Sequence, residues 1–209
     1  MTRRLAILGA GGHARVVADA AEAAGWTVPG LFDREAPPGD WPWPVLGDAE
    51  TLIAQASAFD GVVVALGDNA RRLDWTLRLA AQGLTLATVI HPTAWVSPRA
   101  TLGGGTVILA QAVVGTGARL GRAVIVNTGA SVDHDCTLDD GVHVSPGARL
   151  AGGVTVGERG WIGIGAVVRE GLSLGQAVRV GAGAAVIEPV QDGQTVVGVP
   201  ARPIGEPGC

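Results

Sequence analysis

Residues 112–153 read AVVGTG ARLGRA VIVNTG ASVDHD CTLDDG VHVSPG ARLAGG when they are divided into sixes. The third residue of each six is Val or Leu, and the first is Ala, Val or Cys. The same phase runs from Ile90 to Val186 without an insertion. A period of six fits neither the 3.6-residue turn of an α-helix nor the two-residue alternation of a strand. It predicts a parallel β-helix built from hexapeptides, in which each hexapeptide forms one short strand and a corner.

The repeat also predicts how the coils of this β-helix stack. Three hexapeptides close one triangular coil of about 18 residues. Equivalent residues of successive coils then lie above one another at about 4.8 Å, the spacing of strands in a sheet. The aliphatic residue of each hexapeptide is expected to point inward, and the small residue to fit the crowded corner.

Residues 1–89 follow a different pattern, in which predicted strands alternate with predicted helices. Strands are expected at 4–8, 27–32, 61–66 and 84–89, and helices at 14–24, 48–56 and 69–82. Residues 34–47 are rich in Pro and Trp and are expected to form an irregular loop. Alternating strands and helices predict a small parallel, Rossmann-like sheet. We therefore expect an α/β domain over 1–89, the β-helix over 90–191 and a tail over 192–209.

The composition of the chain argues against several functions. The chain has 209 residues, 33 Gly and a net charge of −4, which predicts a globular protein with no broad attraction to nucleic acid. Its two cysteines, Cys136 and Cys209, provide no disulfide framework. The apolar run at the N-terminus is too short for a signal sequence, and no stretch of about 20 apolar residues predicts a membrane span. A cytoplasmic protein is expected.

A glycine-rich turn lies between the first predicted strand and the first predicted helix. It reads Gly9-Ala-Gly-Gly-His13, and Asp33 follows at the end of the second strand. This arrangement is a dinucleotide-binding fingerprint, whose glycines let the backbone approach a diphosphate at a helix N-terminus. A nucleotide sugar carries the same diphosphate, and the domain is short for a complete dinucleotide fold. The turn therefore predicts a nucleotide-sugar site, with NAD or FAD binding and a purely structural turn as alternatives.

His134 lies at an outward phase of the repeat, between Asp133 and Asp135. A carboxylate beside an imidazole can fix its tautomer and raise its basicity. One coil further on, above His134, stands Gly152, which leaves room over the ring and exposes a backbone N–H. A base beside an oxyanion donor is the arrangement that acyl transfer requires. A zinc site is not expected, because His143 lies on a different face.

Several motifs together resemble a known family. Residues 127–136, NTGASVDHDC, and 143–154, HVSPGARLAGGV, resemble the nucleotide-sugar acetyltransferases, including the bacillosamine and perosamine N-acetyltransferases and the sialic acid O-acetyltransferase group. The glycine turn with Asp33, residues 67–71 (GDNAR) and residues 198–202 (GVPAR) extend the resemblance over essentially the whole chain. The resemblance implies that the β-helix is left-handed.

It also implies roles for individual residues. The catalytic residues would be His134 as general base, Asp135 as its acidic partner, Asn127 in support of that pair, and Gly152 as an N–H donor. Acetyl-CoA would be the co-substrate, without a metal, and would be bound by His143, Gly152, Trp161, Ile164, Ala182, Pro200 and Arg202. A nucleotide sugar would be bound by Gly9, Gly11, Gly12, His13, Asp33, Arg34, Gly67 and Asn69.

The family resemblance further implies a homotrimer with acetyl-CoA between adjacent subunits. On a lone prism the outward residues Val107, Val113, Ile125 and Trp161 would expose apolar surface, which also favours contact with a neighbour. The expected function is N-acetylation of a nucleotide-linked amino sugar in polysaccharide biosynthesis, by direct attack on the thioester. A sugar O-acetyltransferase and a non-enzymatic, nucleotide-binding trimeric scaffold are the alternatives.

Overall fold

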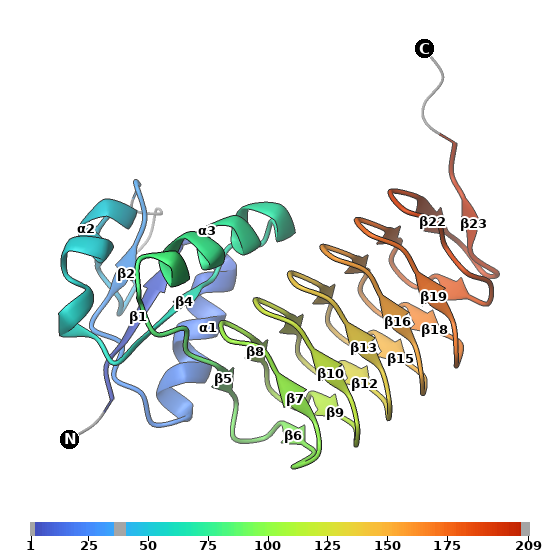
Figure 1. Ribbon diagram of the computed structural model, residues 1–209, viewed down its shortest axis with the longest axis horizontal. Helices are drawn as coiled ribbons and strands as arrows, with labels where there is room; N and C mark the ends of the chain where they lie inside the picture. Colours follow the sequence, from blue (N-terminus) through green and yellow to red (C-terminus); the bar gives the residue numbers. More distant parts are fainter. Residues whose placement is uncertain (1–2, 36–40, 206–209) are drawn as a thin grey trace.

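The computed structural model describes residues 3–35 and 41–205, and combines an α/β part with a long prism of short strands (Figure 1). The α/β part lies at one end of the prism, and the C-terminal tail leaves from the other end. None of the helices in the described ranges is both long enough and apolar enough to cross a membrane.

The α/β part contains a four-stranded parallel sheet with the order β3-β2-β1-β4. Its elements are β1 (Leu5–Leu8), α1 (Gly12–Ala23), β2 (Leu31–Phe32), β3 (Val45–Gly47), α2 (Ala49–Ala54), the 3-10 helix η1 (Ala56–Ala58), β4 (Gly61–Val64) and α3 (Asn69–Ala81). The small parallel sheet predicted from the alternating pattern is therefore confirmed, and Asp48 caps α2 by accepting a hydrogen bond from the Thr51 N–H at 2.9 Å.

The sequence pattern was wrong about parts of this sheet. The segment 34–47 was expected to be irregular, but its end forms β3; residues 36–40 of that segment lie outside the described ranges. The N–H of Leu31 donates to the carbonyl of Pro44 at 2.8 Å. A proline is tolerated here because β3 is an edge strand. The strand expected over 27–32 is reduced to β2 and one isolated bridge at Thr27.

The prism has three faces, each a parallel sheet of two- and three-residue strands. The first face contains β5 (Val89–Ile90), β8 (Val107–Ile108), β11 (Ile125–Val126), β14 (His143–Val144), β17 (Trp161–Ile162), β20 (Arg179–Val180), β22 (Thr195–Val197) and the antiparallel β23 (Arg202–Pro203). The second contains β6 (Trp95–Val96), β9 (Val113–Val114), β12 (Ser131–Val132), β15 (Arg149–Leu150), β18 (Val167–Val168) and β21 (Ala185–Val186). The third contains β7 (Thr101–Leu102), β10 (Arg119–Leu120), β13 (Thr137–Leu138), β16 (Thr155–Val156) and β19 (Ser173–Leu174).

The register of the prism follows the predicted period. Ile125 pairs with His143, and His143 pairs with Trp161, so residues 18 apart are stacked. The inward aliphatic series is buried from Ile108 to Val186. Every sixth residue from Gly105 to Gly183 has positive φ, five of them non-glycine, and these residues form corners of the left-handed coils. The last coil is shorter, because Arg179 pairs with Thr195 only 16 residues later.

The α/β part covers the beginning of the first face. Val107 and Ile125 are buried there within a single chain, and Val107 belongs to the same apolar cluster as Val17 of α1. The expectation that Val107 and Ile125 expose apolar surface was therefore wrong, since the protein's own α/β part packs on this face. Val113 on the second face remains 40% exposed. His143 is still buried under this cover, and the open portion of the first face begins beyond it.

Candidate active site

His134 lies in the corner between β12 and β13, with its side chain 58% exposed. Its Nδ1 lies 2.9 Å from Oδ2 of Asp135, and its backbone N–H donates to Asp133 at 2.7 Å. The pKa of His134 is raised above its ordinary value, first by the hydrogen bond to Asp135 and then by the charge of Asp133. Because Asp135 accepts from Nδ1–H, the neutral ring has its free lone pair on Nε2.

Gly152, one coil above His134, lies directly against that lone pair. A Cβ added to Gly152 would collide with Nε2 of His134, so only glycine leaves space for the imidazole in this position. In the described part of the chain, the Gly152 N–H donates no hydrogen bond. The base and the free N–H predicted from the spacing of the two residues are therefore next to each other.

His143 has the opposite environment. It is buried on β14, its ring centroid lies 4.4 Å from that of Trp161, and burial lowers its pKa to about 3, with Arg72 as the second cause. The Asn127 Oδ1 accepts from the Thr128 N–H at 2.8 Å, so the amide directs Nδ2 at Nε2 of His143, 3.1 Å away. His143 is thus neutral with its proton on Nδ1, an atom that is buried and without a partner among the described residues.

Within one chain Asn127 does not reach His134 or Asp135, so its expected support of that pair stays a prediction. Asn127 was expected to support His134 and Asp135, but within the chain its side chain contacts His143 instead. It lies in the coil below His143, just after β11 on the first face, whereas His134 lies in the corner between the second and third faces. A single chain therefore does not bring His134 and His143 into one site.

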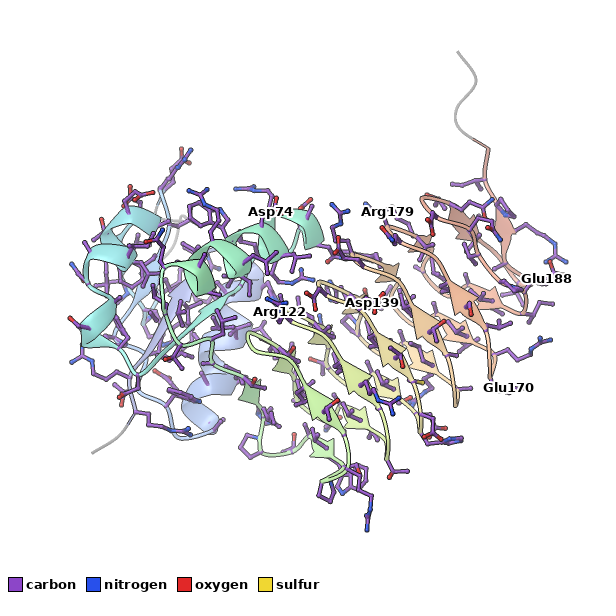
Figure 2. The ribbon with its side chains drawn as sticks, viewed as in Figure 1. Asp74, Arg122, Asp139, Glu170, Arg179 and Glu188 are labelled. Carbon is purple, nitrogen blue, oxygen red and sulfur yellow. The ribbon has the colours of Figure 1, made fainter. Side chains whose placement is uncertain are left out.

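The first face continues from His143 into an open hollow of about 400 Å³. Trp161, Ile164 and Ala182, all expected to bind acetyl-CoA, line it, and Ile164 is 58% exposed. Figure 2 shows Arg179, which also lines the hollow, projecting at the rim of the coils. Pro200 and Arg202 do not line the hollow; they lie at the end of the same face, in the segment from β22 to β23.

The glycine turn lies where β1 and β4 end and where the strand order reverses, which is the ligand-binding position of parallel sheets. Gly9 has φ of 120°, and a Cβ there would lie 2.8 Å from the Ala65 carbonyl oxygen, so Gly9 is required for packing. A Cβ at Gly11 or Gly12 would meet nothing, which leaves their backbone open to a ligand. The Ala10 N–H donates to Asp33 at 2.9 Å and so braces the turn.

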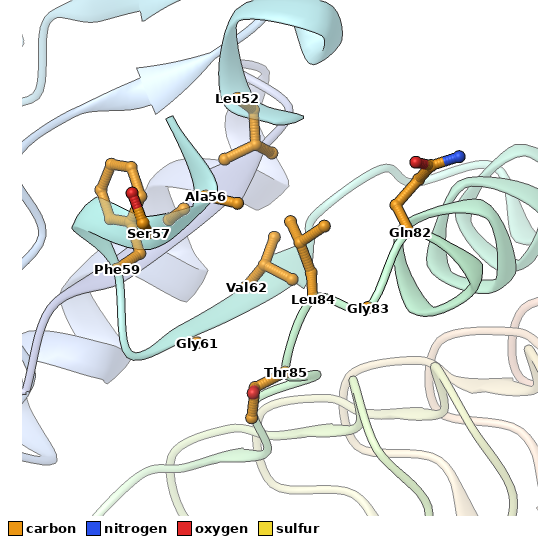
Figure 3. Close-up of a pocket in the computed structure, with 11 residues that line it drawn as sticks. Leu52, Ala56, Ser57, Phe59, Gly61, Val62, Gln82, Gly83, Leu84 and Thr85 are labelled. Atoms are coloured by element: carbon orange, nitrogen blue, oxygen red, sulfur yellow. The ribbon is translucent and has the colours of Figure 1, made fainter. Parts of the chain in front are cut away.

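A hollow of about 150 Å³ opens beside this turn. Its lining includes Gly9, Asp33 and Arg34 from the expected nucleotide-sugar site, together with Asp48, Glu50 and Arg71. The structure thus brings these expected residues together at one edge of the sheet. A second hollow, at the amino end of β4, is lined mainly by apolar residues and contains no expected site residue (Figure 3).

His13 and Asn69 lie against the prism instead of in that hollow. The ring centroid of His13 lies 6.3 Å from that of His143, and burial lowers the pKa of His13 to about 4. The Asn69 Nδ2 donates to the carbonyls of Arg159 and Gly160, each at 3.0 Å. The Asn69 amide is therefore bonded to the prism, and Asn69 lines a different hollow, shared with Gly67 and Trp161, so its expected role at the nucleotide sugar stays a prediction.

Two further observations concern metal binding and two arginines that the sequence analysis did not single out. Among the described residues no group of three His, Cys, Asp or Glu side chains is placed to hold a metal. Gly67 lines a hollow of about 470 Å³ together with Trp161, Arg159 and Arg179. The two arginines were not singled out from the sequence, although Arg179 occupies the outward position one coil beyond Trp161, which the repeat itself specifies.

Comparison with known proteins gives consistent matches. The family model described as the PglD N-terminal domain matches residues 4–79. The acetyltransferase domain of PglB from Neisseria gonorrhoeae FA1090, solved in complex with acetyl coenzyme A, is 42% identical with a TM-score of 0.93, and the match covers 98% of this chain and 100% of that chain. No curated protein sequence matches significantly.

Two other solved structures extend this likeness. PerB from Caulobacter crescentus, in complex with CoA and GDP-perosamine, is 39% identical with a TM-score of 0.91; the match covers 96% of this chain and 97% of that chain. WeeI from Acinetobacter baumannii AYE is 23% identical with a TM-score of 0.80, and the match covers 96% of this chain and 99% of that chain. At this identity the likeness supports the fold alone. Both parts of the chain, and their arrangement, are thus shared with proteins solved with acetyl-CoA or CoA.

Proposed function

Because the chain belongs to the left-handed β-helix acetyltransferases that act on nucleotide-linked amino sugars, we propose that it transfers an acetyl group from acetyl-CoA to such an amine. The observation that carries the proposal is His134, which is bonded to Asp135 and lies against Gly152, in a chain that matches an acetyl-CoA-bound acetyltransferase over 98% of its length. PerB, solved with GDP-perosamine, supports an amino sugar as the acceptor.

The transfer is a direct attack on the thioester. The Nε2 atom of His134 takes a proton from the acceptor amine as the amine nitrogen attacks the thioester carbonyl carbon. The Gly152 N–H is free to donate to the oxyanion of the tetrahedral intermediate, which is worth about 10²–10³ in rate. The C–S bond then breaks, and the CoA thiolate receives the proton from His134. Asp135 holds the ring in the reactive tautomer throughout.

The acceptor's diphosphate is proposed to lie on the glycine turn. Gly11 and Gly12 leave their backbone open, and Arg34 and Arg71 line the adjacent hollow. An aspartate in place of Gly11 meets no steric obstacle but adds a negative charge at the phosphate position. We expect Gly11→Asp to weaken nucleotide-sugar binding by at least about 10-fold, roughly 1.4 kcal/mol, while acetyl-CoA binding stays within about twofold, as measured by calorimetry. Equal loss of both ligands would contradict separate sites.

A homotrimer is proposed because each chain has the two halves of the site in different places, and neither place is complete without a second chain. His134 and Gly152 lie in the corner between the second and third faces, whereas His143 and Trp161 lie on the first face. A neighbouring copy that sets its His134 corner against this face would complete the site, with acetyl-CoA between them. Light scattering should give three times the chain mass, and an active monomer would contradict the proposal.

The decisive experiment offers the protein acetyl-CoA with UDP-, GDP-, dTDP- and CMP-linked amino sugars and measures release of the CoA thiol. Matched hydroxyl sugars test O-acetylation, and the position of the new acetyl group is read by NMR. The expected result is thiol release with an amino sugar only, abolished in His134→Ala. Nucleotide-sugar binding without thiol release from any acceptor would favour a binding scaffold and overturn the proposal.

A further inference from the structure

Arg72 of α3 is the only Arg, Asp or Glu side chain among the described residues that is fully buried. Within those residues no carboxylate lies at ion-pair distance from its guanidinium. Its Nε donates to the Ala123 carbonyl at 2.9 Å, and one terminal nitrogen donates to the Gly141 carbonyl at 2.7 Å and to Oδ1 of Asn69 at 2.9 Å. Burial of a charged guanidinium is unfavourable unless its N–H groups all find hydrogen-bond acceptors, so the buried position of Arg72 suggests a specific role.

The acceptors of Arg72 and Asn69 form a regular series. Ala123, Gly141 and Arg159 occupy the same corner of three successive coils, between the third and first faces, and all have positive φ. Within the described residues the prism's own backbone ladder leaves the carbonyls of these corner residues without a donor. Arg72 takes the first two, and Asn69 takes the third. The series therefore offers a row of acceptors spaced about 4.8 Å apart, the rise of one coil.

Helix α3 is matched to this row. In Figure 1 it lies along the edge of the prism, beginning over the middle coils and running back towards the α/β part. Thr76 packs against the Gly105 corner, Leu73 against the Gly141 corner, and Asn69 reaches the Arg159 corner. Residues three and four apart share one face of a helix, so one face of α3 contacts four successive corners.

Arg72 also connects this edge to the glycine turn. Its other terminal nitrogen donates to the Leu66 carbonyl at 3.1 Å, just beyond β4. The neighbouring Ala65 carbonyl is the group against which Gly9 packs, at the start of the turn that carries His13. His13 in turn lies against His143 on the first face. The contacts thus run from the prism corner, through Arg72 and the end of β4, to the turn, and back to the prism.

We propose that Arg72 is a positioning residue for acetyl transfer, which together with Asn69 fixes the glycine turn and its bound acceptor relative to the acyl-donor groove. The inference rests on the proposed function, in which the acceptor is held by the α/β part and the donor by the prism. Only a forked guanidinium can bond two neighbouring coils and the Leu66 carbonyl together; a lysine ammonium retains the charge but has no fork. Misplacement of a reactant by about 1 Å can cost about 10² in rate.

The test compares Arg72→Met and Arg72→Lys with Arg78→Met, an exposed arginine on the same helix that serves as the control. Dissociation constants for acetyl-CoA and for the nucleotide sugar are measured separately from kcat. We expect Arg72→Met to lower kcat by about 10–10² while both ligands still bind within about threefold, with Arg72→Lys between it and wild type. Arg78→Met should match wild type. A kcat within twofold of wild type for Arg72→Met would overturn the inference.

A second readout does not depend on activity. Histidine NMR should show that His13 and His143, whose pKa values lie near 4 and 3, do not titrate above pH 5 in the wild type. In Arg72→Met both should titrate at higher pH, in part because the charge of Arg72 itself lowers the two pKa values. Arg72→Lys keeps that charge, so a higher titration pH of both histidines in this variant reports that the turn moves off the prism and water enters. If Arg72→Met does not fold, Asn69→Ala serves in its place, and it should show a smaller fall in kcat and a smaller rise in the titration pH of the two histidines. Unchanged histidines in a folded variant would overturn the inference, whereas absence of thiol release in the wild type would count only against the proposed function.

Discussion

His134 and His143 are only nine positions apart in sequence, yet their surroundings give them opposite properties. His134 stands in a corner between two aspartates, which raise its pKa, while His143 is enclosed by Trp161, Asn127 and the α/β part, and burial lowers its pKa to about 3. The first histidine is a base that can carry a proton, and the second is a neutral group with a fixed tautomer. His134 lies in a corner with carboxylates on both sides, whereas His143 lies on a strand that is covered, so the difference comes from the neighbouring charges of one histidine and the burial of the other.

Removal of His134 should have the largest effect on turnover. His134→Ala leaves Gly152 and the groove intact, and we expect turnover to fall by at least about 10²-fold, within the 10²–10⁴ range of general-base catalysis. Because the side chain is exposed, the free energy of unfolding should change by no more than about 0.5 kcal/mol. Steady-state kinetics and urea denaturation check both parts. Near-normal turnover from pH 6 to 9 would place the base elsewhere.

Gly152→Ala should approach that effect by displacing the base. The added Cβ would collide with Nε2 of His134, so the imidazole must rotate away from the reacting amine. We expect turnover to fall by about 10²-fold with little loss of stability. The turnover of the double variant His134→Ala/Gly152→Ala should lie within about threefold of the slower single variant, because both changes remove the same interaction. Additive losses would show that the two residues act independently.

Acid should destabilise the protein through the buried histidines. The pKa values of His13 and His143 are lowered to about 4 and about 3, so the unfolded chain binds more protons below pH 6.5, and stability falls as pH falls from there towards 3. Each histidine should cost on the order of 2 kcal/mol between pH 7.5 and pH 5. Urea denaturation at the two pH values measures this. His143→Gln should remove about half of the difference, and His134→Ala should leave it unchanged.

The smallest expected effect is a shift of the pH–rate profile. Since neutral His134 is the active form and its pKa is raised, kcat/KM should increase with pH through an inflection above 6.5. Asp135→Asn removes the main cause of the raised pKa of His134 and should therefore move the inflection to lower pH. His143→Gln should leave the inflection in place, because His143 does not titrate in this range. An inflection unaffected by Asp135→Asn would separate the profile from His134.

The repeat allowed most of the fold and the juxtaposition of His134 and Gly152 to be predicted. Spacing alone placed Gly152 over His134, since a strict period fixes which residues are stacked. Several contacts that escaped prediction depend on the packing of the α/β part on the first face. Ile125 is buried and Asn69 is bound to the prism for that reason. No local pattern in either part records how the two parts are docked.

Arg72 was missed for a related reason. Its position on α3, three residues after Asn69 and between positions that face the core, would ordinarily predict an apolar side chain. The acceptors that make an arginine stable there are carbonyls of coils about 50 and 70 residues later in the sequence. The edge strand β3 was missed because Pro and Trp conceal its short pattern.

The row of corner carbonyls has a consequence for how the length of such a protein can change. In a regular prism, insertion or deletion of one whole coil keeps every inward residue inward and alters only the height. Here α3 is matched to the corners at Gly105, Ala123, Gly141 and Arg159, so an added coil in that segment would put Thr76 and Asn69 out of step with their partners. Beyond Ala177, where α3 makes no such contact, the prism could be lengthened or shortened without disturbing the docked α/β part.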